Sequence, residues 1–264
     1  MTLTQELDKI YYFMKRDIIS FSTYKTNILL SVISALFGAL SYAYLGANAS
    51  MPSVEKLGMP LVTWLLIGLA FNTYLSQSLT LVQRTINPWS LEEVLVSPTG
   101  LATFIIGSSL WGFIWSTLVI VIYLAVGVLA FGVILSINII GTAIVVALGI
   151  GTFIGFSMIG AGVLILTKQG DPVTTVITIA TNLFGNVLYP VTVMPIPLQI
   201  ISFFVPQYYF FNCIRPMLIG QSINSIFHDL AILSLMCFII LPLGYFIYAW
   251  CLKTSRKSGT LSWF

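Results

Sequence analysis

Six long apolar stretches dominate this chain and decide what it can fold into. They span residues 26–45, 59–81, 101–126, 137–167, 173–188 and 230–252. A helix of about 20 apolar residues crosses the hydrocarbon core of a bilayer, because it satisfies its backbone polar groups within its own segment. The fifth stretch is the shortest. The pattern predicts an all-α polytopic membrane protein with six transmembrane helices.

The composition agrees with a chain solvated mainly by lipid. Only 7% of the 264 residues are charged and 58% are hydrophobic, whereas ordinary soluble domains carry about 25% charged residues. The net charge of +3 is small, and the basic residues form no stripe suited to a nucleic acid. We expect a single transmembrane domain over residues 1–264, made of a cytoplasmic helix (1–25), five spans (26–188), an outer segment (189–229), the sixth span (230–252) and a cytoplasmic tail (253–264).

The basic residues predict the orientation, because Lys and Arg in short loops favour the cytoplasmic side. With both termini inside, the cytoplasmic basic residues are Lys9, Lys15, Arg16, Lys25, Arg84, Lys168, Lys253, Arg256 and Lys257. Only Lys56 and Arg215 are then outside. We expect a multi-pass protein of the plasma membrane with cytoplasmic N- and C-termini.

Residues 3–21 predict an amphipathic helix, because apolar residues recur there at steps of three and four. Basic residues beside the first span favour a position along the inner leaflet, in contact with membrane lipids. A helix that binds a partner or is merely solvated is the alternative. The residues expected at the interface are Leu7, Ile10, Met14, Lys15, Arg16 and Ile18.

The outer segment 189–229 is apolar but interrupted by prolines, so it cannot form one continuous span. We expect half-helices near 198–205 and 207–220 that dip into the outer leaflet against neighbouring helices. Its aromatic residues fit the membrane interface, and a second interpretation is that they line the exit of a transport path. The residues assigned to this re-entrant exit are Tyr189, Pro190, Pro195, Pro197, Phe203, Phe204, Pro206, Tyr208, Tyr209 and Arg215.

Motifs for enzyme chemistry and for ion coupling are missing from the sequence. No Gly-Lys dipeptide occurs, so the chain has no GxxxxGK[ST] phosphate loop. His228 has no companion ligands, and the three cysteines have no CxxC spacing, so no metal or catalytic set is expected. Gly151 and Gly155 form GxxxG, which in a polytopic protein usually serves helix packing.

Every acidic residue lies outside the central part of a predicted span. Proton- or sodium-coupled carriers usually keep ionisable groups near the midplane of the bilayer. Energy for active transport would therefore have to come from outside this chain.

The loop between the second and third predicted spans contains a short helix signal. Ser90 and Glu93 fit an S-x-x-E capping box, and Pro98 ends the helix. Its apolar face suits a groove on a soluble partner, although a capped connector lying on the membrane fits equally well. The residues expected to dock are Ser90, Leu91, Glu92, Glu93, Val94 and Leu95.

Together these features resemble the membrane subunit of type-2 ABC exporters, the small six-span permeases of drug, lipid and polysaccharide export. The resemblance covers nearly the whole chain. It rests on the segment Ser90 to Pro98, on Tyr189-Pro190, Met194 to Leu198, Val205 to Tyr209, Arg215 and Gly220, and on the N-terminal amphipathic helix. Asn87, Pro88 and Trp89 depart from the Gly-Thr pair common in the family.

The resemblance implies that two permeases, identical or homologous, pair with two separate ATPase subunits. The short helix around 91–95 would dock on the ATPase, which would bind ATP and Mg²⁺, and this chain would hold no cofactor and catalyse no reaction. An ATP-independent six-span channel or carrier is the main rival. A membrane scaffold or an intramembrane enzyme forms a third class.

The sequence indicates only the broad chemical class of the cargo. Few charges in the spans favour a hydrophobic or amphipathic molecule, such as a drug or a lipid-like compound. Aromatic residues can also stack on sugar rings, so a glycoconjugate is the other candidate.

Overall fold

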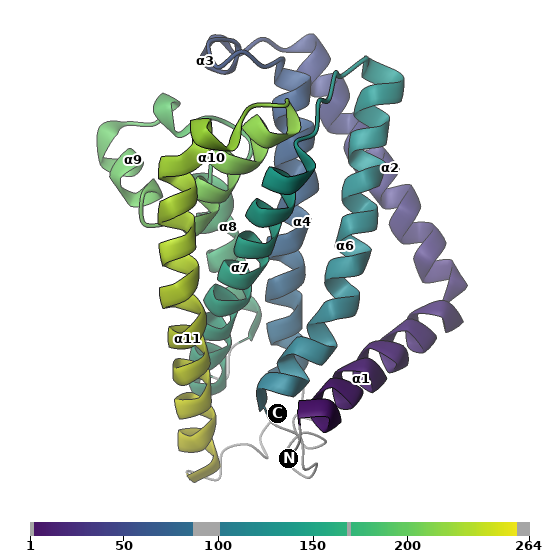
Figure 1. Cartoon of the computed structure of the whole chain (residues 1–264), viewed down its shortest axis with the longest axis vertical. Coiled ribbons are helices and arrows are strands. Elements are labelled where there is room, and N and C mark those ends of the chain that lie inside the picture. The colour runs from purple at the N-terminus through teal and green to yellow at the C-terminus, as the bar shows by residue number, and fades with distance from the viewer. Residues whose placement is uncertain (1–2, 87–100, 168–169, 258–264) are drawn as a thin grey trace.

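The computed structural model describes residues 3–86, 101–167 and 170–257, and the regular secondary structure within these ranges is helical. The helices are α1 (Leu3–Thr23), α2 (Lys25–Asn48), α3 (Pro52–Glu55), α4 (Leu61–Ile86), α6 (Leu101–Phe131), α7 (Ile139–Thr167), α8 (Gly170–Phe184), α9 (Ile196–Ser202), α10 (Pro206–Leu218) and α11 (Phe227–Lys257), with 3-10 turns at Val191–Val193 and Ile223–Ile226. The start of α1 and the end of α11 lie at one end of the molecule, and α3, α9 and α10 lie at the other, here called the far end (Figure 1).

Four of the six predicted spans are helices long and apolar enough to cross a bilayer. Among the described residues these are Lys25–Asn48, Ser109–Phe131, Ile139–Ile165 and Ile223–Ser255. The stretch at 59–81 lies in the 26-residue helix α4, whose middle carries the polar residues Asn72 and Gln77. The stretch at 173–188 lies only in part in a helix, because α8 has 15 residues and ends at Phe184. The six-span count therefore depends on α4, which is less apolar, and on α8, which is shorter than the about 20 residues of a full crossing.

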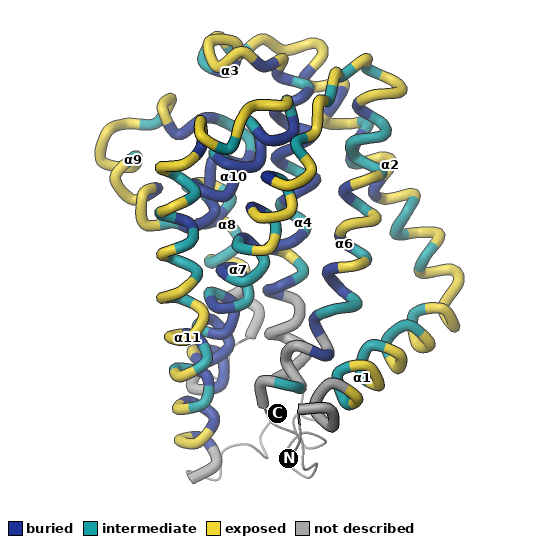
Figure 2. Tube along the Cα trace, viewed as in Figure 1, coloured by how far each residue is buried: buried dark blue, intermediate teal, exposed yellow. Residues whose placement is uncertain are grey.

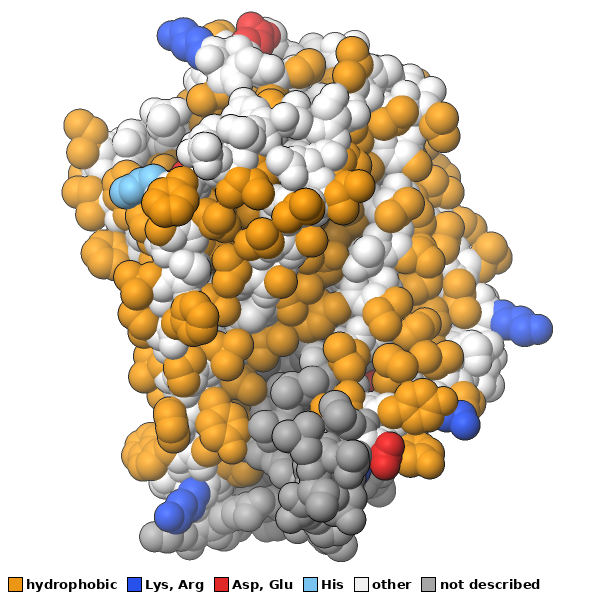
Figure 3. All heavy atoms as spheres, in the orientation of Figure 1, with side chains coloured by type: hydrophobic (Ala, Val, Ile, Leu, Met, Phe, Trp, Pro, Cys, Tyr) orange, Lys and Arg blue, Asp and Glu red, His pale blue; other side chains and the backbone are white. Residues whose placement is uncertain are grey.

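An aromatic core joins α4, α7 and α10, which lie in the middle of the bundle. Phe210 of α10 is fully buried, and its ring centroid lies 5.1 Å from that of Phe153 and 6.2 Å from that of Phe71. Figure 2 shows α4 and α10 as largely buried, whereas α11 carries many exposed residues. These include Phe238, 78% exposed, and Phe246, 68% exposed. Hydrophobic side chains cover the face over α11, α7 and α6 in Figure 3, as expected for a surface that meets lipid.

Helix α7 packs on α11 through small residues that let the two backbones approach. A Cβ atom at Gly155 would lie 2.6 Å from the Cα atom of Leu241, and one at Gly244 would meet the backbone of Gly155. One at Gly151 would lie 2.9 Å from the Sγ atom of Cys237. The GxxxG pair thus packs helices, as its sequence predicts.

The cysteines are unpaired packing residues, in agreement with their sequence context. Cys251 lies beside Gly162 in the α7–α11 contact, and Cys213 is fully buried in α10. Burial raises the pKa of the Cys213 thiol to about 12, so the thiol stays protonated at neutral pH.

The N-terminal amphipathic helix is confirmed as a helix, α1, and it packs on α6. Phe21 places its ring centroid 4.6 Å from that of Trp115 and 5.5 Å from that of Trp111. A membrane-surface position for α1 stays a prediction. Among the predicted interface residues, Ile10, Met14 and Ile18 are half-buried, Lys15 and Arg16 are exposed, and the side chain of Leu7 lies outside the described part.

The proline-rich segment forms two short helices at the far end, with bounds that differ from the predicted ones. Helix α9 begins at Ile196 and ends at Ser202, instead of spanning 198–205. Helix α10 begins at Pro206 and ends at Leu218, so Pro206 is its first residue. Proline suits the first turn because the N–H it lacks would have no helical partner there. Gly220 follows α10 with a φ of 82°, which glycine adopts readily.

Candidate functional site

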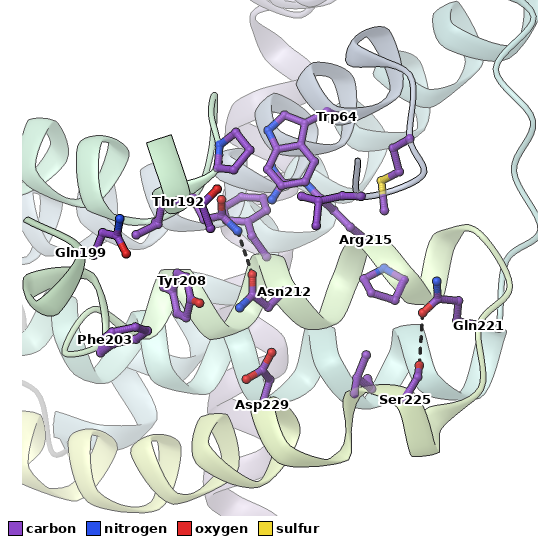
Figure 4. Close-up of a pocket in the computed structure, with 18 residues that line it drawn as sticks. Trp64, Thr192, Gln199, Phe203, Tyr208, Asn212, Arg215, Gln221, Ser225 and Asp229 are labelled. Carbon is purple, nitrogen blue, oxygen red and sulfur yellow. Dashed lines mark hydrogen bonds between the residues drawn. The ribbon is translucent and has the colours of Figure 1, made fainter. Parts of the chain in front are cut away.

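A cavity of about 410 Å³ lies at the far end, where residues of α4, α9, α10 and α11 meet the segment after α8. Trp64 contributes from α4, Asn186 from the segment after α8, Tyr208 and Arg215 from α10, and Asp229 from α11 (Figure 4). The volume falls within the range of about 300–1,000 Å³ typical of small-molecule sites.

Arg215 is the most deeply buried charged residue of this cavity, with 1% of its surface exposed. Its guanidinium carbon lies 3.5 Å from the ring centroid of Trp64 and 5.0 Å from that of Phe211, so the cation contacts two aromatic faces. Nη2 donates a 2.8 Å hydrogen bond to the carbonyl of Val187. Gly68 makes room for this arrangement, because a Cβ there would collide with that carbonyl and lie 3.2 Å from Nη2.

Burial acts on the charge of Arg215 as well as on its packing. It lowers the pKa of the guanidinium, since the charged form loses its hydration. An arginine side chain nevertheless keeps its proton in proteins. The cavity wall therefore holds a desolvated positive charge.

Two amide pairs fix the backbone around the cavity. Asn186 has a φ of 62°, a left-handed conformation that asparagine tolerates, and its Nδ2 donates a 2.8 Å hydrogen bond to Oδ1 of Asn212. Beside it, Nε2 of Gln207 donates a 2.8 Å hydrogen bond to Oδ1 of Asn72. The first pair ties the segment after α8 to α10, and the second ties α4 to α10.

Several buried polar atoms of the wall have no hydrogen-bond partner within the described residues. They are the donors Nε1 of Trp64 and Nε and Nη1 of Arg215, and the acceptor Oδ1 of Asn186. A buried donor without an acceptor costs about 1–3 kcal/mol. An anionic oxygen-rich group would supply acceptors for the three donors.

Asp229 brings a carboxylate to the same cavity from the start of α11. Figure 4 shows it on the side of Asn212 away from Trp64. In the part of the chain that the structure describes, no ion pair links it to Arg215. The two opposite charges thus line one space without neutralising each other by direct contact.

The structure brings part of the predicted exit residues together. Pro190, Phe203, Tyr208 and Arg215 line the cavity. Pro206 and Tyr209 are buried in α10, and Tyr189 is half-buried. Pro195, Pro197 and Phe204 are exposed around α9.

The other predicted groups lie elsewhere. The interface residues of α1 are at the opposite end of the molecule (Figure 1). The predicted docking residues Ser90, Leu91, Glu92, Glu93, Val94 and Leu95 lie outside the described residues.

The sequence interpretation missed the contribution of Trp64, Asn186 and Asn212. A survey of charged residues in the spans overlooks them because they are neutral. For Asn186 and Asn212 the sequence signal is an amide side chain in apolar surroundings, where it needs a partner.

Comparison with known proteins assigns the family. Residues 8–219 match the family described as ABC-2 type transporter. No curated protein matches the chain. The matched range runs from α1 to the end of α10; it includes Trp64 and Arg215 of the far-end cavity, and Asp229 lies beyond it. Because the match covers most of the chain, this protein belongs to the ABC-2 type transporter family and is a membrane permease component.

Proposed function

We propose that this permease is the membrane subunit of an ATP-driven exporter whose ATPase is a separate subunit. The observation that carries the proposal is the family match over residues 8–219, in a sequence that has no phosphate loop of its own. ATP and Mg²⁺ would bind to the partner. This chain would form the substrate pathway and catalyse no reaction.

The proposed topology has six spans and both termini in the cytoplasm of a plasma-membrane protein. The start of α1 and the end of α11 lie at the same end of the molecule (Figure 1). This arrangement supports an even number of membrane crossings. Helices α4 and α8 would supply the two crossings beyond the four long apolar helices. Helices α9 and α10 would then be re-entrant from the outer face.

The proposed contact with the ATPase is the segment 90–95, between α4 and α6. The end of α4 and the start of α6 lie at the same end as the start of α1, opposite the cavity (Figure 1). Two permeases and two ATPases would form the complex, with one docking segment on each ATPase. The cargo would be hydrophobic or amphipathic, or a glycoconjugate.

A double substitution in the docking segment tests the coupling. Glu92→Ala with Leu95→Asp removes one carboxylate from the segment and replaces an apolar side chain with a charged one. We expect the ATPase to separate from the permease during purification in mild detergent, and cargo-stimulated ATP hydrolysis to disappear. The measurement is the stoichiometry of the purified complex and its ATPase rate in proteoliposomes.

The matched control is Glu55→Ala with Ile134→Asp, which makes the same two changes at exposed positions of the far end. Glu55 is exposed, and Ile134 is 84% exposed. This control should purify with its ATPase. A docking variant that transports normally contradicts the proposal, and a permease that purifies alone and conducts without ATP favours the channel or carrier.

A further inference from the structure

We propose that the far-end cavity binds a zwitterionic headgroup, with its phosphate against Arg215 and its ammonium beside Asp229. The inference goes beyond the proposed function, because such a site can hold a bound lipid whether or not that lipid is cargo. It rests on the cavity, the buried charge and the orphaned polar atoms described above.

The anionic half of the headgroup follows from Arg215. Only its Nη2 has a hydrogen-bond acceptor in the described residues, the carbonyl of Val187, whereas its Nε and Nη1 are left over. Trp64 stacks on the guanidinium and leaves its own Nε1 without an acceptor. A phosphate has several acceptor oxygens and binds one edge of a guanidinium fork, so it would satisfy one of these orphaned nitrogens together with Nη2.

The cationic half follows from Asp229. A purely anionic ligand would meet this carboxylate in the same cavity, and a purely cationic one would meet Arg215. A phosphate joined to an ammonium offers an opposite charge to each. The rings of Phe203 and Tyr208, whose centroids lie 5.5 Å apart, also line the cavity and offer aromatic faces to an ammonium group.

The surroundings suit an amphiphile. Gln199 of α9 and Phe203, the residue directly after α9, line the cavity, while the neighbouring surface is apolar and exposed. Ile196 is 74% exposed and Phe204 is 77% exposed. An acyl chain attached to the headgroup could lie along this surface, which favours a phospholipid over a free headgroup compound.

Binding to the purified permease tests the proposal without any ATPase, so its failure is separate from failure of the proposed exporter. Native mass spectrometry in a maltoside detergent measures the affinity for dihexanoyl phosphatidylcholine and for dihexanoyl phosphatidylglycerol, which has the same chains and no ammonium. Free phosphocholine is added as a competitor. We expect the phosphatidylcholine to bind about tenfold more tightly than the phosphatidylglycerol, the difference of one favourable charge contact.

Two variants remove the two charges separately. Arg215→Gln should weaken binding of both lipids by about tenfold or more, because hydrogen bonds to a charged group are lost. Asp229→Asn should remove the preference for the zwitterion and strengthen binding of the phosphatidylglycerol. Glu55→Gln and Lys56→Gln are the matched controls, since they change exposed charges at the same end.

The outcomes decide both the site and the source of its ligand. Competition by free phosphocholine identifies the headgroup alone as sufficient, and binding of the lipid without such competition identifies a membrane lipid. Unchanged phosphatidylcholine affinity in Arg215→Gln, or equal binding of both lipids to the unmodified permease, overturns the proposal. If Arg215→Gln does not give a monodisperse protein, the change in lipid preference in Asp229→Asn decides, and an unchanged preference overturns the proposal.

Discussion

The far-end cavity and the α7–α11 contact are two buried regions that differ in what their residues contact. Along α7 and α11, Gly155 and Gly244 bring backbone onto backbone, and neighbouring residues fill the remaining space. Around the cavity, Arg215, Trp64 and Asn186 keep polar atoms without partners. Close van der Waals contact between backbones holds the first region together, whereas the polar atoms of the second have hydrogen-bonding capacity left for a ligand.

In a chain with few charges, this difference distinguishes residues that pack helices together from residues that could bind a ligand. Small residues allow close van der Waals contact between helices in lipid, where apolar burial gives little driving force. A desolvated cation with unused donors costs free energy unless something compensates it. A region of the second kind is therefore the better place to look for a ligand.

The largest expected loss of stability comes from a substitution in the α7–α11 contact. Gly155→Ala should destabilise the protein by about 1–3 kcal/mol, because the added Cβ meets the rigid backbone of α11. Gly160→Ala is the control, since its Cβ would lie 3.1 Å from Cδ1 of Ile177, a flexible side-chain end. Both variants gain the same helix propensity, so the difference in thermal unfolding in detergent reports the packing alone. Equal stability of the two variants would contradict the close contact.

A smaller effect is expected at the polar region. Asn72→Ala should cost about 1–2 kcal/mol, because it leaves Nε2 of Gln207 buried without an acceptor. Asn72→Ala combined with Gln207→Ala should cost less than the sum of the two single changes. Thr73→Ala is the neighbouring control, since its hydroxyl donates to the carbonyl of Ala70 within its own helix. Strictly additive unfolding free energies would show that the amides do not interact.

The smallest effect on stability is expected at an orphaned polar atom outside the cavity, which can be compared with the orphaned atoms of the cavity wall. Ser157 of α7 is 1% exposed and its Oγ has no partner among the described residues. Ser157→Ala should change stability by less than about 0.5 kcal/mol or increase it, since no hydrogen bond is lost. Ser78→Ala is the matched control, because that equally buried hydroxyl donates a 2.9 Å hydrogen bond to the carbonyl of Tyr74. A larger loss for Ser157→Ala than for Ser78→Ala would reveal a role that the structure does not show.

The helical elements were predictable because their signals are local. Apolar length marks α2, α6, α7 and α11, and the three-and-four spacing of apolar residues marks α1. The bounds of α9 were less predictable, because its prolines and apolar residues permit several starts. Pro195 comes directly before α9 and Pro197 lies within its first turn, so the helix begins earlier than 198.

The candidate site was predictable only in part. Prolines and aromatic residues pointed to the segment that holds Phe203, Tyr208 and Arg215. Trp64 is separated from Arg215 by most of the chain, and no pattern within either segment links the two. Asp229 is one of the acidic residues outside the predicted spans, and no sequence signal links it to Arg215.

The sequence by itself determined that this chain is a helical membrane protein, because apolar length and scarce charge are properties of each segment. The sequence also indicated the family, since the motifs occur along the chain in the family's order. Only the tertiary structure decided which residues meet at the far end. Contact between α4, α10 and the start of α11 depends on helix packing, and that packing alone placed a stacked arginine and a carboxylate around one cavity.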